Sequence, residues 1–210
     1  MQYITHYHSP LGKITLAADK TGLTGLWFEG QKYFALHLEP EHEEKELPVF
    51  ADAKRWLDIY FSGREPDFSL PLHFTGSDFQ NEVWGILSAI PYGQTTTYGE
   101  IAKQLAQRRE VPRMSAQAVG GAVGKNEISI IVPCHRVVGT NGSLTGYAGG
   151  IRRKIALLKL EGAWKENYYV PKKSTALRWG VLSTLRLRYD RSQPIRCPAQ
   201  SVRPSPAEAE

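Results

Sequence analysis

Cysteine is scarce in this sequence, and its scarcity excludes several kinds of site. The 210 residues include only two cysteines, Cys134 and Cys197, which lie far apart in the chain. They provide no disulfide framework and no CxxC pair that could hold zinc. On this ground alone, Cys134 is either a buried packing residue, as free cysteine often is, or a nucleophile.

Long apolar segments are missing as well. Even the most apolar stretches, such as residues 128–132, are far shorter than the roughly 20 residues that a helix needs to cross a bilayer. The N-terminus, Met1-Gln2-Tyr3, lacks the charged and apolar regions of a signal peptide. We therefore expect a cytoplasmic protein without a membrane partner.

The net charge of +5 is unevenly distributed. Residues 163–210 hold nine basic and four acidic residues, so residues 1–162 are neutral. Within that neutral part, residues 1–75 have seven basic and eleven acidic residues, whereas residues 76–162 have ten basic and six acidic. A polyanion such as a nucleic acid would prefer the second half, although most charge runs are only solvated faces.

The first part of the chain predicts a small sheet followed by a helix. Residues 3–8, 14–18 and 23–28 favour strands and are separated by turns, which predicts an antiparallel meander. Residues 39–48 are densely charged and predict an exposed loop. A helix that ends at Ser62-Gly63 should follow, because apolar residues fall at helical spacing: Phe50, Ala53, Leu57, Tyr60 and Phe61.

Helices are expected after a proline-containing linker at residues 64–75. Ser77 can cap a helix whose apolar residues run from Phe79 to Ile90. Thr97-Tyr98-Gly99-Glu100 is a capping-box pattern at the start of a second helix. Ser115 can cap a third helix at residues 116–123, and the last two helices have the outline of a helix-turn-helix.

The third of these helices has almost no bulky side chains. It contains Gly120 and Gly121 in its interior, and each costs a helix roughly 1 kcal/mol relative to alanine. Two explanations are open. Either helix backbones pack closely at this point, or the helix has to approach a ligand as large as DNA.

A candidate reactive site lies at residues 128–138, Ile-Ser-Ile-Ile-Val-Pro-Cys-His-Arg-Val-Val. We expect Cys134 at the end of a buried apolar strand, with Pro133 fixing the backbone before it. A thiol attacks as the thiolate, and its ordinary pKa is about 8.5. A nearby histidine or cation lowers that pKa. The Cys-His dipeptide alone is a weak signal, because neighbours on an extended chain point in opposite directions.

The run Pro133-Cys134-His135-Arg136-Val137 resembles the active-site signature of the O6-alkylguanine-DNA alkyltransferases, also called methylated-DNA–protein-cysteine methyltransferases. Other segments between residues 1 and 163 match this family in the same order: Pro91-Tyr92-Gly93, Thr97-Tyr98, Ala118-Val119-Gly120-Gly121-Ala122, Asn126, Gly146-Tyr147-Ala148-Gly149-Gly150 and Leu160-Glu161-Gly162. The resemblance implies an α+β fold. An N-terminal ribonuclease H-like domain with an antiparallel sheet and a helix (residues 1–75) precedes a helical winged-helix or helix-turn-helix-like catalytic domain (residues 76–163).

The resemblance also implies DNA repair in a single turnover. The alkyl group of O6-alkylguanine, or of O4-alkylthymine, moves irreversibly to Cys134 without a cofactor or a metal. The partner is double-stranded DNA whose damaged nucleotide is turned out of the helix, and the protein acts as a monomer. In the family's chemistry, His135 acts as a base through one water and Glu161 orients the imidazole. Tyr98 donates a hydrogen bond to the departing guanine, and Asn126 braces the cysteine segment.

The same resemblance assigns the binding residues. Tyr147 lines the pocket for the base, and the remaining substrate-binding residues are Arg136, Val137, Gly149 and Gly150. The helix-turn-helix lies in the minor groove, where small residues permit close approach. Its DNA-binding residues are Thr97, Ser115, Ala116, Gln117, Ala118, Gly120 and Gly121.

Two features depart from the family pattern. Gln117 stands where relatives usually carry an arginine that fills the gap left by the flipped base, so we expect weaker or more lesion-dependent DNA binding. Residues 164–210 mix basic and aromatic residues with an end rich in Pro, Ala and Glu, which predicts a disordered tail that repair does not need. Non-specific nucleic-acid binding by this tail is the alternative.

Two other functions are open from the sequence. One is a lesion-binding module resembling the alkyltransferase-like proteins, but those proteins lack the reactive cysteine. The other is a cysteine hydrolase that uses Cys134 and His135. A hydrolase needs an oxyanion hole, and no motif in the sequence indicates one.

Overall fold

The N-terminal part of the chain forms a sheet of four strands. The computed structural model describes residues 1–171, and residues 172–210 lie outside the described part. Strands β1 (Gln2–Ser9), β2 (Gly12–Ala18) and β3 (Leu23–Phe28) pair antiparallel, which confirms the predicted meander. Strand β4 (His42–Glu44) pairs parallel to β1 at the other edge, so the order is β3-β2-β1-β4.

The short strand β4 corrects the prediction of a loop throughout residues 39–48. Its three residues, His-Glu-Glu, are all exposed and polar. Strand prediction relies on apolar residues that alternate with polar ones, and an edge strand that buries no side chain has no such pattern. The pairing with β1 is therefore invisible in the sequence.

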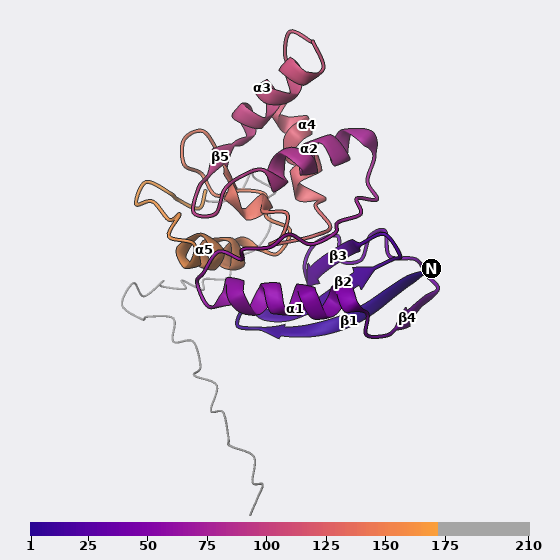
Figure 1. The fold of residues 1–210 in the computed structure, drawn as a ribbon. Helices are drawn as coiled ribbons and strands as arrows, with labels where there is room; N and C mark the ends of the chain where they lie inside the picture. The colour runs from indigo at the N-terminus through magenta and orange to yellow at the C-terminus, as the bar shows by residue number, and fades with distance from the viewer. Residues whose placement is uncertain (172–210) are drawn as a thin grey trace, which may run out of the picture. The chain divides into compact units, whose positions relative to one another are not determined.

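Helix α1 (Pro48–Phe61) lies along this sheet, as Figure 1 shows. A proline occupies its first turn, where the missing N–H has no helical partner to lose. Its buried residues are Phe50, Ala53, Leu57 and Tyr60, as the helical spacing predicts. The helix ends at Ser62 and Gly63, and Gly63 adopts a φ of 83° that suits glycine.

The second half consists of helices whose beginnings agree with the predicted caps. Helices α2 (Asp78–Ser88) and α3 (Tyr98–Arg108) begin with capping boxes at Ser77 and Thr97. Helix α4 (Ala116–Gly124) begins at Ser115, whose hydroxyl accepts a hydrogen bond from the N–H of Ala118. Helix α5 (Ile151–Leu160) follows a loop, and α2, α3 and α4 contact one another (Figure 1).

The segment before the cysteine is not the strand that its apolar residues predict. Residues 128–132 form turns, with one bridge between Leu26 and Ile128 and with Ile130 at a φ of 72°. Cys134 opens a short 3-10 helix, η1 (Cys134–Arg136), which leads into β6 (Val137–Val138). A short apolar run shows only that a segment is buried, and it does not distinguish a strand from compact turns.

The two halves share contacts around this segment. The N–H of Leu26 in β3 donates to the carbonyl of Glu127 at 2.8 Å, and the N–H of Ser129 donates to the carbonyl of Leu26 at 3.0 Å. In addition, β5 (Thr96–Thr97) pairs parallel with β6, which places the beginning of α3 beside the residues that follow η1. The cysteine segment is therefore held between β3 and the helical half.

Residues 164–171, which the sequence assigns to a disordered tail, pack against the helical half. Tyr168 is buried, and its hydroxyl lies 2.8 Å from Oγ1 of Thr95. The N–H of Leu144 donates to the carbonyl of Tyr169 at 2.8 Å. The rest of the predicted tail lies outside the described residues. Among residues 1–171, no helix has the length and apolar character needed to cross a membrane.

The packing of β3 yields a prediction about stability. The ring of Trp27 covers Gly25, so that a Cβ atom added at Gly25 would lie 1.9 Å from the ring. We expect Gly25→Ala to lower the free energy of unfolding by about 1 to 3 kcal/mol, because Trp27 is buried and the ring has to move. Urea unfolding measures the effect.

The matched control is Gly85→Ala. Gly85 lies on the exposed side of α2, and an added Cβ meets nothing within 4 Å. This substitution should raise the free energy of unfolding by about 1 kcal/mol, since alanine favours the helix. Equal changes in the free energy of unfolding for the two substitutions would contradict the packing of the Trp27 ring over Gly25.

Candidate active site

The thiol of Cys134 is buried and surrounded by groups with opposite effects on its ionisation. The residue is 4% exposed. Burial raises the pKa of the Cys134 thiol, whereas the hydrogen bond from Asn126 and the positive charge of Lys154 act to lower it. The amide Nδ2 of Asn126 lies 3.1 Å from Sγ. The resting group is therefore a thiol with stabilising partners for a thiolate already in place.

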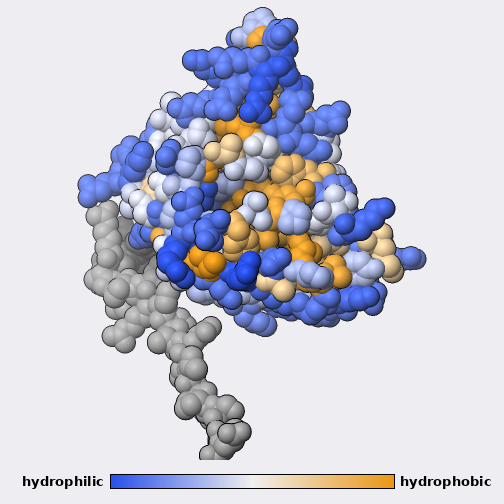
Figure 2. Space-filling view, in the orientation of Figure 1, coloured by the Kyte–Doolittle hydropathy of each residue, from blue (hydrophilic) through white to orange (hydrophobic). Residues whose placement is uncertain are grey.

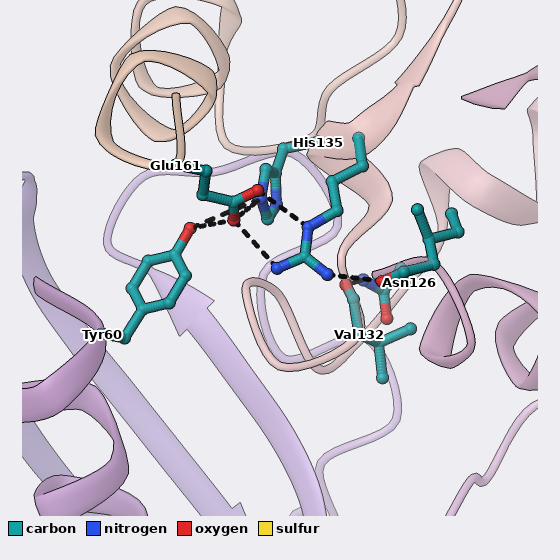
Figure 3. Close-up of polar contacts among 7 residues, drawn as sticks. Tyr60, Asn126, Val132, His135 and Glu161 are labelled. Carbon is teal, nitrogen blue, oxygen red and sulfur yellow. Dashed lines mark hydrogen bonds and ion pairs between the residues drawn. The ribbon is translucent and has the colours of Figure 1, made fainter. Parts of the chain in front are cut away.

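Asn126 also holds the turns that lead to Cys134. Its Nδ2 donates to the carbonyl of Val132 at 2.8 Å (Figure 3). Its Oδ1 accepts from the N–H of Ile128 at 3.1 Å. Because one side chain links both ends of the turn and the sulfur, the geometry agrees with the predicted bracing position. The residue itself is buried.

His135 and Glu161 form a buried pair directly beside the cysteine. Nε2 of His135 lies 2.6 Å from Oε1 of Glu161, and neither side chain is exposed. This contact assigns the proton to Nε2 and leaves Nδ1 as an acceptor. Nδ1 has no hydrogen-bond partner among the described residues. The predicted proximity of His135 and Glu161 is therefore present, with one ring nitrogen still able to accept a proton.

The ionisation of this pair follows from its partners. Burial acts to raise the pKa of Glu161, but the hydrogen bonds from His135 and Arg136, together with the positive charge of Arg136, outweigh it and lower the pKa to about 2. Burial lowers the pKa of His135, although Glu161 acts in the opposite direction. The resting pair is therefore a carboxylate beside a neutral imidazole, which is able to act as a base.

Arg136, which is predicted to bind substrate, pairs with Glu161. Its Nε donates to Oε2 of Glu161 at 2.8 Å, and its Nη2 donates to Oε1 at 3.0 Å. Its Nη1 donates to the carbonyl of Ile90 at 2.6 Å. A buried carboxylate needs a countercharge, and a guanidinium fits two carboxylate oxygens at once. This geometry makes Arg136 a partner of Glu161.

Tyr147, the first of the predicted pocket residues, lies beside His135. The ring of Tyr147 is 8% exposed, and its centroid lies 6.3 Å from that of His135, edge to face. A Cβ atom at Gly149 would lie 2.6 Å from the Tyr147 ring, so glycine is required there. Gly150 precedes α5 at a φ of 89°, and Val137 is fully buried.

Lys154 is a charged residue at this site that the sequence analysis missed. It is fully buried in α5, and its Nζ donates to the carbonyls of Val137 at 2.5 Å and Thr145 at 2.9 Å. Burial lowers the pKa of Lys154 to about 8, while the charge of the Cys134 thiolate would raise it. Lys154 lies three and four residues before the buried Leu157 and Leu158, and this helical spacing predicts that it shares their buried face.

Tyr98 lies between α4 and the loop before α5, which contains Thr145. Its hydroxyl donates to the carbonyl of Thr145 at 3.0 Å, and an added Cβ at Gly120 would lie 3.7 Å from its ring. Burial, followed by the charge of a Cys134 thiolate, raises the pKa of Tyr98 to about 12. The phenol is therefore protonated at neutral pH and remains a hydrogen-bond donor.

All the predicted DNA-binding residues except Thr97 lie on α4 or at its N-cap. The exposed positions are Ser115, Ala116, Gln117, Ala118 and Gly121, while Gly120 is half-buried. Thr97 is also half-buried, and its hydroxyl caps α3 by accepting from the N–H of Glu100 at 3.1 Å. In Figure 2, hydrophilic residues cover most of the neighbouring helix α3 at the top of the view.

Tyr60 is the second site residue that the sequence analysis missed. It was expected only as an apolar-face residue of a helix, but its hydroxyl lies 2.5 Å from Oε1 of Glu161 and 3.4 Å from Nε2 of His135. Helical spacing identifies a buried face and gives no sign of what a tyrosine hydroxyl contacts. Within residues 1–171, no three His, Cys, Asp or Glu side chains gather closely enough to hold a metal ion.

Comparison with known proteins gives matches over both halves of the chain. Residues 2–74 match the model of the 6-O-methylguanine DNA methyltransferase, ribonuclease-like domain. Residues 78–163 match the 6-O-methylguanine DNA methyltransferase, DNA binding domain. These matches confirm the predicted α+β fold, with an N-terminal sheet and a helical second part.

Individual relatives agree with the family models. A methylated-DNA–protein-cysteine methyltransferase of Methanosarcina acetivorans is 44% identical over 162 residues, which make up 77% of this chain and 99% of that protein. One of Mycobacterium bovis is 46% identical over 161 residues, or 74% of this chain and 92% of that protein. The crystal structure of Mycobacterium tuberculosis OGT in complex with DNA matches with a TM-score of 0.66 at 43% identity, covering 77% and 93% of the two chains.

The buried charge of Glu161 predicts how stability depends on pH. Glu161→Gln should lower the free energy of unfolding by about 3 kcal/mol at pH 7, because Arg136 loses its countercharge. The pKa of Glu161 falls from 4.5 to about 2 on folding, so this stabilisation is complete above pH 4.5 and is lost as the pH falls toward 2. Guanidinium unfolding of both proteins at pH 7 and at pH 3 measures the change.

Glu82→Gln is the control for this experiment. It removes a carboxylate that pairs with Arg109 on the surface at 2.9 Å, so it should change stability little at either pH. A difference between wild type and Glu161→Gln that stays the same from pH 7 to pH 3 would show that Glu161 is not a stabilising carboxylate.

Proposed function

Because the chain belongs to the 6-O-methylguanine DNA methyltransferase family, we propose that it repairs O6-alkylguanine by moving the alkyl group to Sγ of Cys134. The observation that carries this proposal is the contact of Cys134 with Asn126, next to the His135–Glu161 pair. O4-alkylthymine is a second substrate of the same chemistry. The protein acts as a monomer on double-stranded DNA, with residues 1–75 as a structural domain and residues 76–163 as the catalytic one.

The transfer is a single displacement. The thiol proton of Cys134 passes through a water to Nδ1 of His135, and Glu161 stabilises the imidazolium that results. The thiolate attacks the alkyl carbon, a C–S bond forms, and the C–O bond breaks with its electron pair passing to the base. The O–H of Tyr98 turns from the carbonyl of Thr145 and donates a hydrogen bond to that oxygen. The product is a thioether, so each molecule repairs one lesion and needs no cofactor.

The burial of the thiol requires the base to leave the DNA stack. Sγ of Cys134 lies inside the protein, in a residue that is 4% exposed, and a base in an intact duplex has no route to it. Extrusion of a nucleotide costs a few kcal/mol, and the pocket beside Tyr147 receives it. Val137, Gly149 and Gly150 complete this pocket.

Helix α4 provides the DNA contact of this proposal. Its exposed face contains only small residues and Gln117, so the minor groove can approach the backbone closely. Gln117 enters the gap left by the extruded base and can hydrogen-bond to the orphaned partner base. It brings no charge there, in contrast to an arginine.

The direct test is a mass measurement after incubation with an O6-methylguanine oligonucleotide duplex. One equivalent of the protein should gain the mass of one methylene group, located on Cys134, in a burst without turnover. Cys134→Ser should bind the duplex but leave it methylated. Binding of the lesion without any mass gain in the wild type would instead indicate a lesion-binding module, and continued turnover would indicate a hydrolase.

Gln117→Arg tests the position on α4. The added charge should tighten binding to lesion-containing DNA several-fold and make the negative slope of log affinity against log salt steeper by about one, as expected for one additional cationic contact. Fluorescence anisotropy over a range of salt concentrations measures both quantities. Unchanged affinity and an unchanged repair rate would exclude this residue from the gap left by the base.

A further inference from the structure

Tyr60 brings the N-terminal half of the chain to the proposed proton relay. It lies in the last turn of α1 and is fully buried. Trp56 stacks on its ring at a centroid distance of 5.4 Å, and Tyr92 meets it edge-on at 6.0 Å. The ring is therefore fixed from two sides, and Figure 3 shows its hydroxyl pointing at Glu161.

The hydroxyl of Tyr60 is one of three donors to a single carboxylate oxygen, Oε1 of Glu161. Oε1 of Glu161 accepts from Tyr60 at 2.5 Å, from His135 at 2.6 Å and from Arg136 at 3.0 Å. Burial, followed by the negative charge of Glu161, raises the pKa of Tyr60 well above its ordinary value. The phenol is thus always protonated here, and toward a carboxylate it can only donate.

We propose that Tyr60 is a positioning residue of the relay, whose phenol holds Oε1 of Glu161 against Nε2 of His135. The inference rests on the proposed function, because it assigns a part in the proton transfer from Cys134. It also gives the N-terminal half a direct part in the chemistry, in addition to its packing.

The hydrogen bond from Tyr60 to Glu161 affects the pH at which His135 loses its proton. A phenol that donates to Oε1 withdraws part of the carboxylate's negative charge and so reduces its pull on an imidazolium proton. Without this bond, Glu161 stabilises the imidazolium more strongly, and His135 stays protonated to a higher pH. The other titratable groups that face the relay are the same with and without the Tyr60 hydroxyl: Arg136 and Cys134 in η1, Lys154 in α5, Tyr147 in the loop before α5, and Tyr92 after α2.

The test is the pH profile of Tyr60→Phe, which keeps the ring and removes only the hydroxyl. The rate constant for single-turnover methyl transfer from an O6-methylguanine duplex should rise with pH through the ionisation of the relay. In Tyr60→Phe this rise should move to higher pH by about one unit, so that the rate is up to about tenfold lower on the acidic limb and recovers at high pH. A purely structural loss would lower the rate equally at every pH.

Tyr7→Phe is the matched control. The hydroxyl of Tyr7 also donates to a carboxylate of α1, Oδ1 of Asp58 at 2.8 Å, but this contact is exposed and involves no residue of the relay. Its profile should coincide with that of the wild type. If the wild type transfers the methyl group and Tyr60→Phe has the same profile, the inference is wrong. If the wild type transfers nothing, the proposed function itself fails.

A second variant covers the case in which Tyr60→Phe does not fold. Placing 3-fluorotyrosine at position 60 keeps the hydroxyl and makes it a stronger donor, because fluorine lowers the pKa of a phenol. The rise in rate should then move to lower pH than in the wild type. A profile that stays in place or moves to higher pH would overturn the positioning role.

Discussion

The site depends on one buried negative charge, the carboxylate of Glu161. The residue is 6% exposed, and a carboxylate removed from water without partners is too costly for a folded protein to keep. Its oxygens accept from Tyr60 in α1 and from His135 and Arg136 in η1, while Glu161 itself ends α5. Three segments that are remote in sequence are therefore held at one point (Figure 3). The orientation of the imidazole is a consequence of satisfying this charge.

The Cys134 thiol differs from the Glu161 carboxylate, because burial keeps it in its uncharged form. Burial disfavours the Cys134 thiolate, and the same burial strengthens each charge interaction that remains, because the local dielectric constant is low. The amide of Asn126 and the ammonium of Lys154 are held in place by bonds to carbonyl oxygens, independently of the state of the sulfur. In the proposed reaction, the groups that stabilise the developing thiolate need no rearrangement when the proton leaves.

Local signals in the sequence predicted helices α1 to α4 and the three-stranded meander, but they did not predict the contacts between elements. The caps at Ser77, Thr97 and Ser115 are side chains that bond to backbone three residues away, so four consecutive positions of sequence contain the whole interaction. The bonds of Tyr60 and Arg136 join residues 101 and 25 positions apart. Spacing along a helix shows which face is buried, and it contains no information about a partner on another element.

The family resemblance supplied the pairing of His135 with Glu161, which the residues alone did not. It did not supply the pairing of Arg136 with Glu161, since a motif records that a residue type is present and not which contacts its side chain makes. Lys154 was missed for a related reason. A lysine in a helix is usually solvated, and only its register with Leu157 and Leu158 places it on the buried face.

The two glycines of α4 bear on the two explanations for its small residues. Gly120 faces the ring of Tyr98, but an added Cβ would make an ordinary van der Waals contact at 3.7 Å, so packing within the protein does not require glycine there. Gly121 is exposed, and an added Cβ would meet nothing within 4 Å. Glycine there lowers helix stability with no internal contact in return. A surface that keeps its backbone accessible at such a cost is suited to a ligand that approaches the helix axis closely, as a nucleic-acid groove does.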